Sequence, residues 1–204
     1  MAEDFKVQRR KGIAAIAVSL VVLVGLWFVL AKAVPPLAAI DSFEARMAFT
    51  LKGLAAAVLF TLVLGVEAVA HERLSSPAFD PLSGFETRRL RVNKQYLQNT
   101  LEQTVVLAVT VLGMAAFATS GAEMREVGAT LVVWVLGRWA FWIGYHRSAA
   151  MRGLGAAGMA VTMILLVIVV ARFGGELAGP VGAAAPVALF LAIEALLFWK
   201  TRPG

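Results

Sequence analysis

The stretch that decides the predicted fold runs from residue 127 to residue 152 and reads VGATLVVWVLGRWAFWIGYHRSAAMR. Its first part is as apolar as a membrane span, but Arg138 interrupts it and an aromatic, basic segment follows. A charge inside an apolar segment is costly unless it faces a partner, the interior of a bundle or a water-filled cavity. At about 100° per residue, five of its side chains fall within roughly 60° of one another on a helical wheel: Trp134, Arg138, Phe141, Tyr145 and Arg152. We expect this stripe to face protein or a ligand.

Composition places the whole chain in the membrane. The 204 residues are 60% hydrophobic and only 16% charged, and the mean hydropathy is +0.79. Such values, with apolar runs of about 20 residues between short polar loops, are typical of a polytopic helical membrane protein. The chain has no cysteine, which excludes a disulfide framework, a thiolate metal site and a cysteine nucleophile. Any thiol chemistry needs a thiol from outside.

Six apolar runs predict six membrane-spanning helices. The third helix is expected to begin near Arg88 as an amphipathic segment, and turns are expected at 120–126 and between Gly174 and Pro180. The first run is interpreted as an uncleaved span, because it is longer than the core of a typical signal peptide; a cleaved signal is the alternative. The last run contains Pro186 and has an interfacial location as its alternative. The runs lie at about 13–34, 48–70, 99–119, 127–145, 153–173 and 181–199.

Charge predicts the orientation. Most of the 19 lysines and arginines lie in four groups, at 6–11, 73–94, 147–152 and 200–202. In a six-span topology these groups share one side of the membrane, so the positive-inside rule places both termini in the cytoplasm. The net charge of +6 is therefore explained without nucleic acid, which we do not expect as a partner.

A second polar stripe is expected on the third helix. Arg91, Gln95, Asn99 and Glu102 are spaced by four, four and three residues, which places them on one face. Such a face suits a zwitterionic ligand with carboxylates and amides; the alternative is that it buries its polar groups against Arg138. Together with Arg138, three carboxylates of the inner half of the membrane further predict a polar cavity open to the cytoplasm: Glu67, Glu102 and Glu194. The alternative, above all for Glu67 and Glu194, is a set of structural ion pairs and of side chains that extend to the membrane interface.

These residues resemble the membrane-associated proteins in eicosanoid and glutathione metabolism, the MAPEG family. Residues 99–102, NTLE, resemble the family's N-x-x-E signature, and the segment from Arg138 through Gly144-Tyr145 to Arg152-Gly153 resembles its R-x-x-Y-x-x-G-Y…R signature. The resemblance implies a four-helix membrane core at 47–173, preceded by a tail and an extra span at 1–46 and followed by an apolar helix at 174–204. It also implies a homotrimer with glutathione bound between subunits near the cytoplasmic side.

The resemblance assigns roles to individual residues. Asn99 and Glu102 would bind glutathione, and Arg138 and Tyr145 would help to hold it. Arg152 would lie beside the sulfur and be the catalytic residue, because a nearby cation lowers the pKa of a thiol and the thiolate is the nucleophile. The sequence departs from the family at two ligand positions. Gln95 stands where an arginine is usual, which leaves Arg91 as the substitute on the same face, and Phe141 replaces a tyrosine.

Two functions therefore compete. The first is a glutathione-dependent transferase or peroxidase of a bacterial inner membrane, which acts on a lipophilic electrophile or hydroperoxide that enters from the lipid. The second is a non-catalytic scaffold that has kept the bundle and its charge network. A dry, fully paired Arg138–Glu102 contact favours the scaffold, and an open cavity lined by Arg152 favours the enzyme. A transporter is disfavoured because no internal repeat is visible, and His71 and His146 lack metal-ligand spacing.

Overall fold

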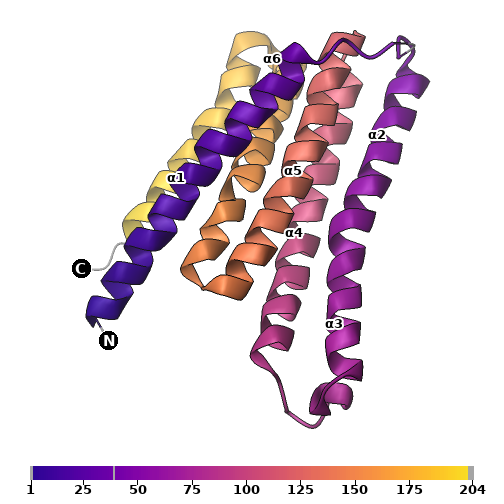
Figure 1. Ribbon diagram of the computed structural model, residues 1–204. Coiled ribbons are helices and arrows are strands. Elements are labelled where there is room, and N and C mark those ends of the chain that lie inside the picture. Colours follow the sequence, from indigo (N-terminus) through magenta and orange to yellow (C-terminus); the bar gives the residue numbers. More distant parts are fainter. Residues whose placement is uncertain (1, 39, 202–204) are drawn as a thin grey trace.

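The protein is an all-helical bundle. A computed structural model describes residues 2–38 and 40–201, with side chains from residue 5 onward, and no strand occurs in this part of the chain. Short connections join the helices (Figure 1). The elements are α1 (Ala2–Ala33), α2 (Phe43–Val58), the π-helical turn η1 (Leu59–Val63), α3 (Leu64–Leu74), the 3-10 turn η2 (Pro77–Phe79), α4 (Arg88–Phe117), α5 (Gly121–Arg147), the 3-10 turn η3 (Ala150–Gly155) and α6 (Ala156–Lys200).

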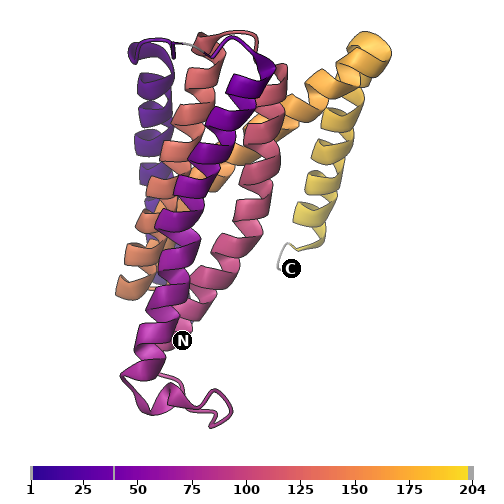
Figure 2. The same ribbon diagram turned by 90° about the vertical axis from the view of Figure 1, so that its right-hand side faces the viewer.

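Six helical runs were predicted, and the structure forms the last two as halves of one bent segment. Five helical segments of the described chain are long and apolar enough to cross a membrane, and the fifth spans Ala150–Lys200. This fifth segment is bent back on itself at Ala178 and Gly179, so that its second half descends beside its first (Figure 2). Gly179 has a φ of +59°, which favours glycine, and Pro180 follows it. The predicted turn is therefore confirmed at this point, whereas Gly174 continues the helix.

The start of α1 and the end of α6 lie toward the same end of the bundle. The start of α1, the loop at 75–87 and the η3 turn lie toward the lower end in Figure 1, and α6 finishes on the same side. We call this the inner end. The arrangement matches the predicted six-span order; Arg202 lies outside the described residues. The chain is thus an integral, multi-pass membrane protein.

Local capping explains where α4 and α5 begin. The α4 helix begins at Arg88, as predicted, because the Thr87 hydroxyl accepts a hydrogen bond from the Leu90 backbone N–H at 2.9 Å. The α5 helix begins at Gly121, inside the segment predicted as a turn. There the Ser120 hydroxyl accepts from the Glu123 N–H at 3.3 Å. This S-x-x-E sequence is a helix-start signal that the prediction missed.

The second half of the first helix is joined to the rest of the bundle by side-chain contacts. The Ser19 hydroxyl donates to the Leu154 carbonyl of η3 at 2.5 Å, and the Trp27 indole donates to Thr130 of α5 at 3.0 Å. Near the opposite end of the bundle, the Lys32 ammonium lies 2.8 Å from the Glu126 carboxylate. These contacts pack the second half of α1 against α5 and η3.

Glycines bring α5, η3 and α6 into close contact. A Cβ atom on Gly137 would lie 3.1 Å from the Cα of Gly158, so the two helices meet backbone to backbone. A Cβ atom on Gly155 would lie 2.7 Å from the Gly137 carbonyl and would overlap the side chain of Phe141. Small residues allow this approach in membrane bundles. It holds the chain between α5 and α6 against the inner half of α5, where the predicted site lies.

Candidate functional site

Arg138 is buried at the centre of the predicted site and is paired with neutral side chains. Only 2% of its surface is exposed. Its Nη1 donates to Asn99 Oδ1 at 3.1 Å and to Gln103 Oε1 at 2.7 Å, and its Nε donates to the Thr100 hydroxyl at 3.2 Å. All three acceptors lie on α4. The remaining guanidinium nitrogen, Nη2, is buried and has no hydrogen-bond partner.

Aromatic rings form the other side of the Arg138 environment. The guanidinium carbon lies 4.5 Å from the centroid of the Phe141 ring and 5.4 Å from that of Tyr96. Tyr96 is fully buried, stacks on Trp142 at 4.7 Å and donates its phenol proton to the Thr61 carbonyl at 3.2 Å. A guanidinium within about 6 Å of a ring face is attracted by it. The rings therefore stabilise a cation that has no carboxylate partner.

A cavity of about 320 Å³ lies beside Arg138, and we call it the Arg138 cavity. Residues of α4, α5 and η3 line most of it, and Ile16 of α1 and Ala156 of α6 complete the lining. The cavity has both polar and apolar walls and lies within the size range of small-molecule sites, about 300–1,000 Å³. It brings together six of the eight site residues predicted from the sequence: Gln95, Asn99, Arg138, Phe141, Tyr145 and Arg152.

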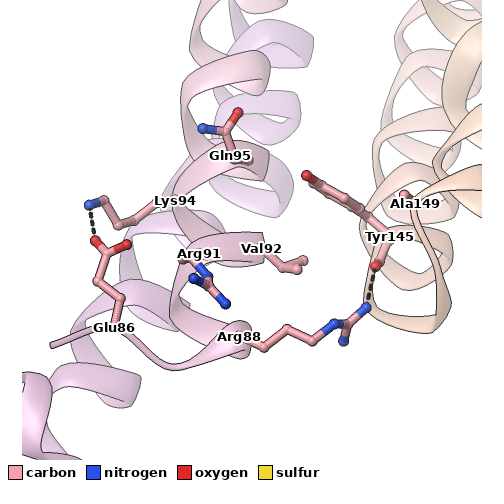
Figure 3. Close-up of a pocket in the computed structure, with 8 residues that line it drawn as sticks. All are labelled: Glu86, Arg88, Arg91, Val92, Lys94, Gln95, Tyr145 and Ala149. Atoms are coloured by element: carbon pink, nitrogen blue, oxygen red, sulfur yellow. Dashed lines mark hydrogen bonds and ion pairs between the residues drawn. The ribbon is translucent and has the colours of Figure 1, made fainter. Parts of the chain in front are cut away.

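Arg91 lies in an adjoining cavity nearer the inner end, of about 570 Å³ (Figure 3). We call it the basic cavity, because Arg88, Arg91 and Lys94 line it with one carboxylate, Glu86. Lys94 binds the Glu86 carboxylate and thereby holds the pKa of that group below its usual range. Arg88 is directed toward α5, where it donates to the His146 carbonyl at 2.8 Å.

The two cavities are adjacent. Gln95 and Tyr145 line both of them, so the two cavities meet at these side chains. Figure 3 shows Gln95 on α4 and Tyr145 on α5 on opposite sides of the space between these helices. Together they offer an elongated site that is cationic at the inner end.

Glu102 is the predicted site residue that lies outside both cavities. It is exposed, and its carboxylate accepts a hydrogen bond from Gln98 on its own helix at 2.8 Å. The predicted cluster of three carboxylates with Arg138 is therefore wrong. Glu67 is directed toward His71, with 3.6 Å between the carboxylate and the imidazole, and Glu194 is exposed. Arg138 instead donates hydrogen bonds to Asn99 and to Gln103, one helical turn later on α4.

Several neighbours of Arg138 were absent from the sequence prediction. Gln103 follows Asn99 by four residues, so a longer reading of the α4 stripe would have found it. Ile16 gave no signal, because it belongs to a helix far away in the sequence. Trp134, predicted on the α5 stripe that faces protein or a ligand, is fully buried in the hydrophobic core.

The histidines lie apart from this site. The His146 ring nitrogen is 2.9 Å from Asn93 Oδ1, and the Trp142 indole donates to the same oxygen at 2.9 Å. Within the described residues, no group of three or more His, Cys, Asp or Glu side chains is placed to hold a metal ion.

The fold and site define an integral membrane helix bundle with a buried arginine beside an inner, cationic cavity. A comparison with protein families finds that residues 49–171, more than half of the chain, match the model of the MAPEG family. The protein therefore belongs to the MAPEG family. The match leaves α1 and the second half of α6 outside its range. No curated protein and no solved structure matches the chain.

Proposed function

We propose that this protein is a glutathione-dependent transferase or peroxidase that acts on a lipophilic electrophile or hydroperoxide. Membership of the MAPEG family supports a glutathione-related activity in general. The specific proposal rests on a guanidinium nitrogen of Arg138 that has no hydrogen-bond partner. This nitrogen, Nη2, is buried beside a cavity that Arg152 also lines. A buried, unpaired donor is costly until water or a ligand satisfies it, and glutathione offers carboxylate and amide oxygens as acceptors.

The ligand fits the cavities by its chemistry. Glutathione carries two carboxylates, an ammonium group and two amides, which suit guanidinium and side-chain amide partners. The thiol of its central cysteine would lie in the Arg138 cavity near Arg152, with Asn99, Gln103 and Arg138 along its backbone. Its carboxylates would extend past Gln95 and Tyr145 toward Arg91. The absence of cysteine from the chain is consistent with a borrowed thiol.

Arg152 would act on the thiol. Its guanidinium carbon lies 6.0 Å from the centroid of the Tyr145 ring, and its side chain is exposed at the edge of the cavity. A cation there favours loss of the thiol proton to solvent. In a transferase, the thiolate then bonds to an electrophilic carbon, and the displaced electron pair leaves with a leaving group or accepts a proton on a neighbouring atom.

The peroxidase reaction begins with the same thiolate. It attacks the terminal oxygen of a hydroperoxide, the O–O bond breaks, and the alkoxide takes a proton to leave as an alcohol. A second glutathione then reduces the resulting sulfenic acid, which gives the disulfide and water. Both reactions need the same activated sulfur, so the proposal covers both.

Glu102 supports the homotrimer as part of this proposal. Its side chain lies on an exposed face of α4, outside both cavities of its own subunit. It would contact glutathione only across a subunit interface, as the family resemblance implies. The lipophilic substrate would come from the lipid, and glutathione would enter at the cytoplasmic end. An Ala- and Val-rich composition favours a bacterial inner membrane.

The scaffold is the second candidate. Arg138 already makes three hydrogen bonds to α4 without any ligand, and such a contact holds two helices together. The Arg138–Glu102 pair that would favour the scaffold, however, is absent, and an open cavity lined by Arg152 is present. By the criterion stated above, this arrangement favours the enzyme.

Calorimetry of glutathione binding tests the proposal. Detergent-purified protein is titrated in buffers of different ionisation enthalpy, which reports the protons released on binding. We expect proton release by the wild type but not by Arg152→Ala, and weaker binding by Asn99→Ala. Arg147→Ala, which removes an exposed arginine from the end of α5, is the matched control and should behave as the wild type. No binding at millimolar glutathione would favour the scaffold.

A further inference from the structure

The N-terminal helix forms a third cavity, of about 500 Å³, against η3. The two elements approach closely there, since a Cβ atom on Gly153 would lie 2.9 Å from the Gly12 carbonyl. Further along, the Ser19 hydroxyl holds the helix to η3 through the Leu154 carbonyl. We call this space the α1 cavity. It depends on a helix that lies outside the range of the family match.

The lining of the α1 cavity is divided by chemistry. Phe5, Ile13 and Ile16 supply an apolar surface, and each has at least 40% of its area exposed. Gln8, Arg9 and Arg152 supply donors, and no acidic side chain is among the described residues that line it. Such a site suits an anion attached to an apolar chain.

Position along the membrane indicates which anion this is. The apolar part of α1 begins at Ile13, and Arg9 lies one helical turn before it toward the inner end. Lipid phosphates lie just outside the hydrocarbon core. Ile16 lies about 10 Å further along the helix axis than Arg9, in the depth of the acyl chains. Arg9 therefore lies at the depth of a lipid phosphate, and Ile13 and Ile16 lie at the depth of the acyl chain attached to it.

We propose that the α1 cavity binds an anionic phospholipid of the inner leaflet, with its phosphate between Gln8 and Arg9 and an acyl chain along Ile13 and Ile16. Basic pockets between helices on the cytoplasmic side are suited to anionic headgroups. Arg152 lines both this cavity and the Arg138 cavity. The lipid site thus adjoins the proposed thiol site through one shared side chain.

Spin-labelled lipids test this proposal in the full chain. The protein is reconstituted into phosphatidylcholine vesicles that contain a trace of spin-labelled phosphatidylglycerol or spin-labelled phosphatidylcholine. The fraction of immobilised label gives the preference for the anionic lipid. The measurement is made at 1 M salt, where the screening length is about 3 Å and only direct contacts survive. We expect phosphatidylglycerol to be preferred several-fold.

Two neighbouring arginines provide a matched pair of variants. Arg9→Gln should lower the preference about fivefold, the effect of one basic contact near a membrane surface. Arg10→Gln removes the same charge from a residue that does not line the cavity, and should leave the preference unchanged at high salt. Gln8→Glu, which places a carboxylate in the cavity with little change of shape, should abolish the preference.

Three results would overturn the proposal. They are equal retention of the two lipids by the wild type, equal losses in Arg9→Gln and Arg10→Gln, or an unchanged preference in Gln8→Glu. The first would indicate an ordinary lipid-facing groove, and the second a general attraction to basic residues. Helix content and monodispersity of each variant confirm that it is folded. The measurement uses no thiol, so its result is independent of glutathione binding.

Discussion

The Arg138 guanidinium lies over the ring of Phe141, with 4.5 Å between the guanidinium carbon and the ring centroid. Phe141 follows Arg138 by three residues on α5, so both side chains project from the same face of the helix. Phe141, which stands where the family usually has a tyrosine, thus contacts the Arg138 guanidinium through the face of its ring. A tyrosine ring has the same face and could make the same contact. The lost phenol leaves this contact intact.

This contact predicts the behaviour of two Phe141 variants. Phe141→Leu should lower the free energy of unfolding by about 0.5–2 kcal/mol beyond the loss of packing, because a desolvated cation–π contact has that magnitude. Phe141→Tyr should keep the cation–π contact and leave the free energy of unfolding close to that of the wild type. Phe117→Leu is the control, since Phe117 lies 5.0 Å from the exposed Arg172 and should contribute less. Thermal unfolding in detergent measures all three; equal losses in the two leucine variants would contradict the prediction.

Arg138→Lys should destabilise the bundle although it keeps the charge. An ammonium group cannot reproduce the separate bonds that Nε and Nη1 make to Thr100, Asn99 and Gln103. Each lost bond to a charged group costs about 1.5–3 kcal/mol. Arg147→Lys, at an exposed position on the same helix, should stay within about 0.5 kcal/mol of the wild type. Denaturant unfolding, followed by helix content, measures the free energy of unfolding of both variants. Equal losses in Arg138→Lys and Arg147→Lys would contradict the prediction.

Gln95→Arg should strengthen glutathione binding about tenfold. Gln95 lies between the two cavities, and a guanidinium there would add a charge-assisted hydrogen bond of at least about 1.4 kcal/mol to a ligand carboxylate. Leu82→Arg provides the control, because Leu82 is 93% exposed in the loop at 75–87 and lines neither cavity. Calorimetry measures both affinities. Similar gains in the two variants would mean that long-range charge, and not this position, controls affinity.

Two glycine variants test the close helix contacts. Gly155→Ala should disrupt the inner end, because the added Cβ would overlap Phe141 and approach the Gly137 carbonyl to 2.7 Å. Gly25→Ala has nothing within 4 Å of its added Cβ and should stabilise α1 by roughly 0.5–1 kcal/mol. Thermal unfolding measures the shifts, and glutathione binding shows whether the cavity survives. If Gly155→Ala left both the unfolding temperature and glutathione binding unchanged, η3 would be able to move away from α5.

The helical runs were predictable because membrane crossing depends on a local property. About 20 consecutive apolar residues are needed to span the hydrocarbon core, and this can be counted along the chain. The start of α4 at Arg88 was equally local, since Thr87 caps it. The start of α5 was missed although its signal was present, because Ser120 and Glu123 were assigned to a turn.

The site was predictable in part for the same reason. Helical periodicity identified Gln95 and Asn99 on α4 and Arg138 and Tyr145 on α5, and all four line one cavity. Periodicity also placed Glu102 on the α4 stripe, and there it was misleading. Asn99, one turn from Gln103, is within reach of Arg138, whereas Glu102 bonds to Gln98 on an exposed face.

The sequence by itself determined the membrane class, the order of the helices and the faces that carry polar side chains, because each depends on residues within a few turns of one another. Only the tertiary structure decided which side chains meet Arg138 and that α1 forms a wall of the cavities. Those contacts join residues such as Ile16, Asn99 and Arg152, which belong to different helices. Their meeting depends on how the helices pack, and helical periodicity carries no information about that.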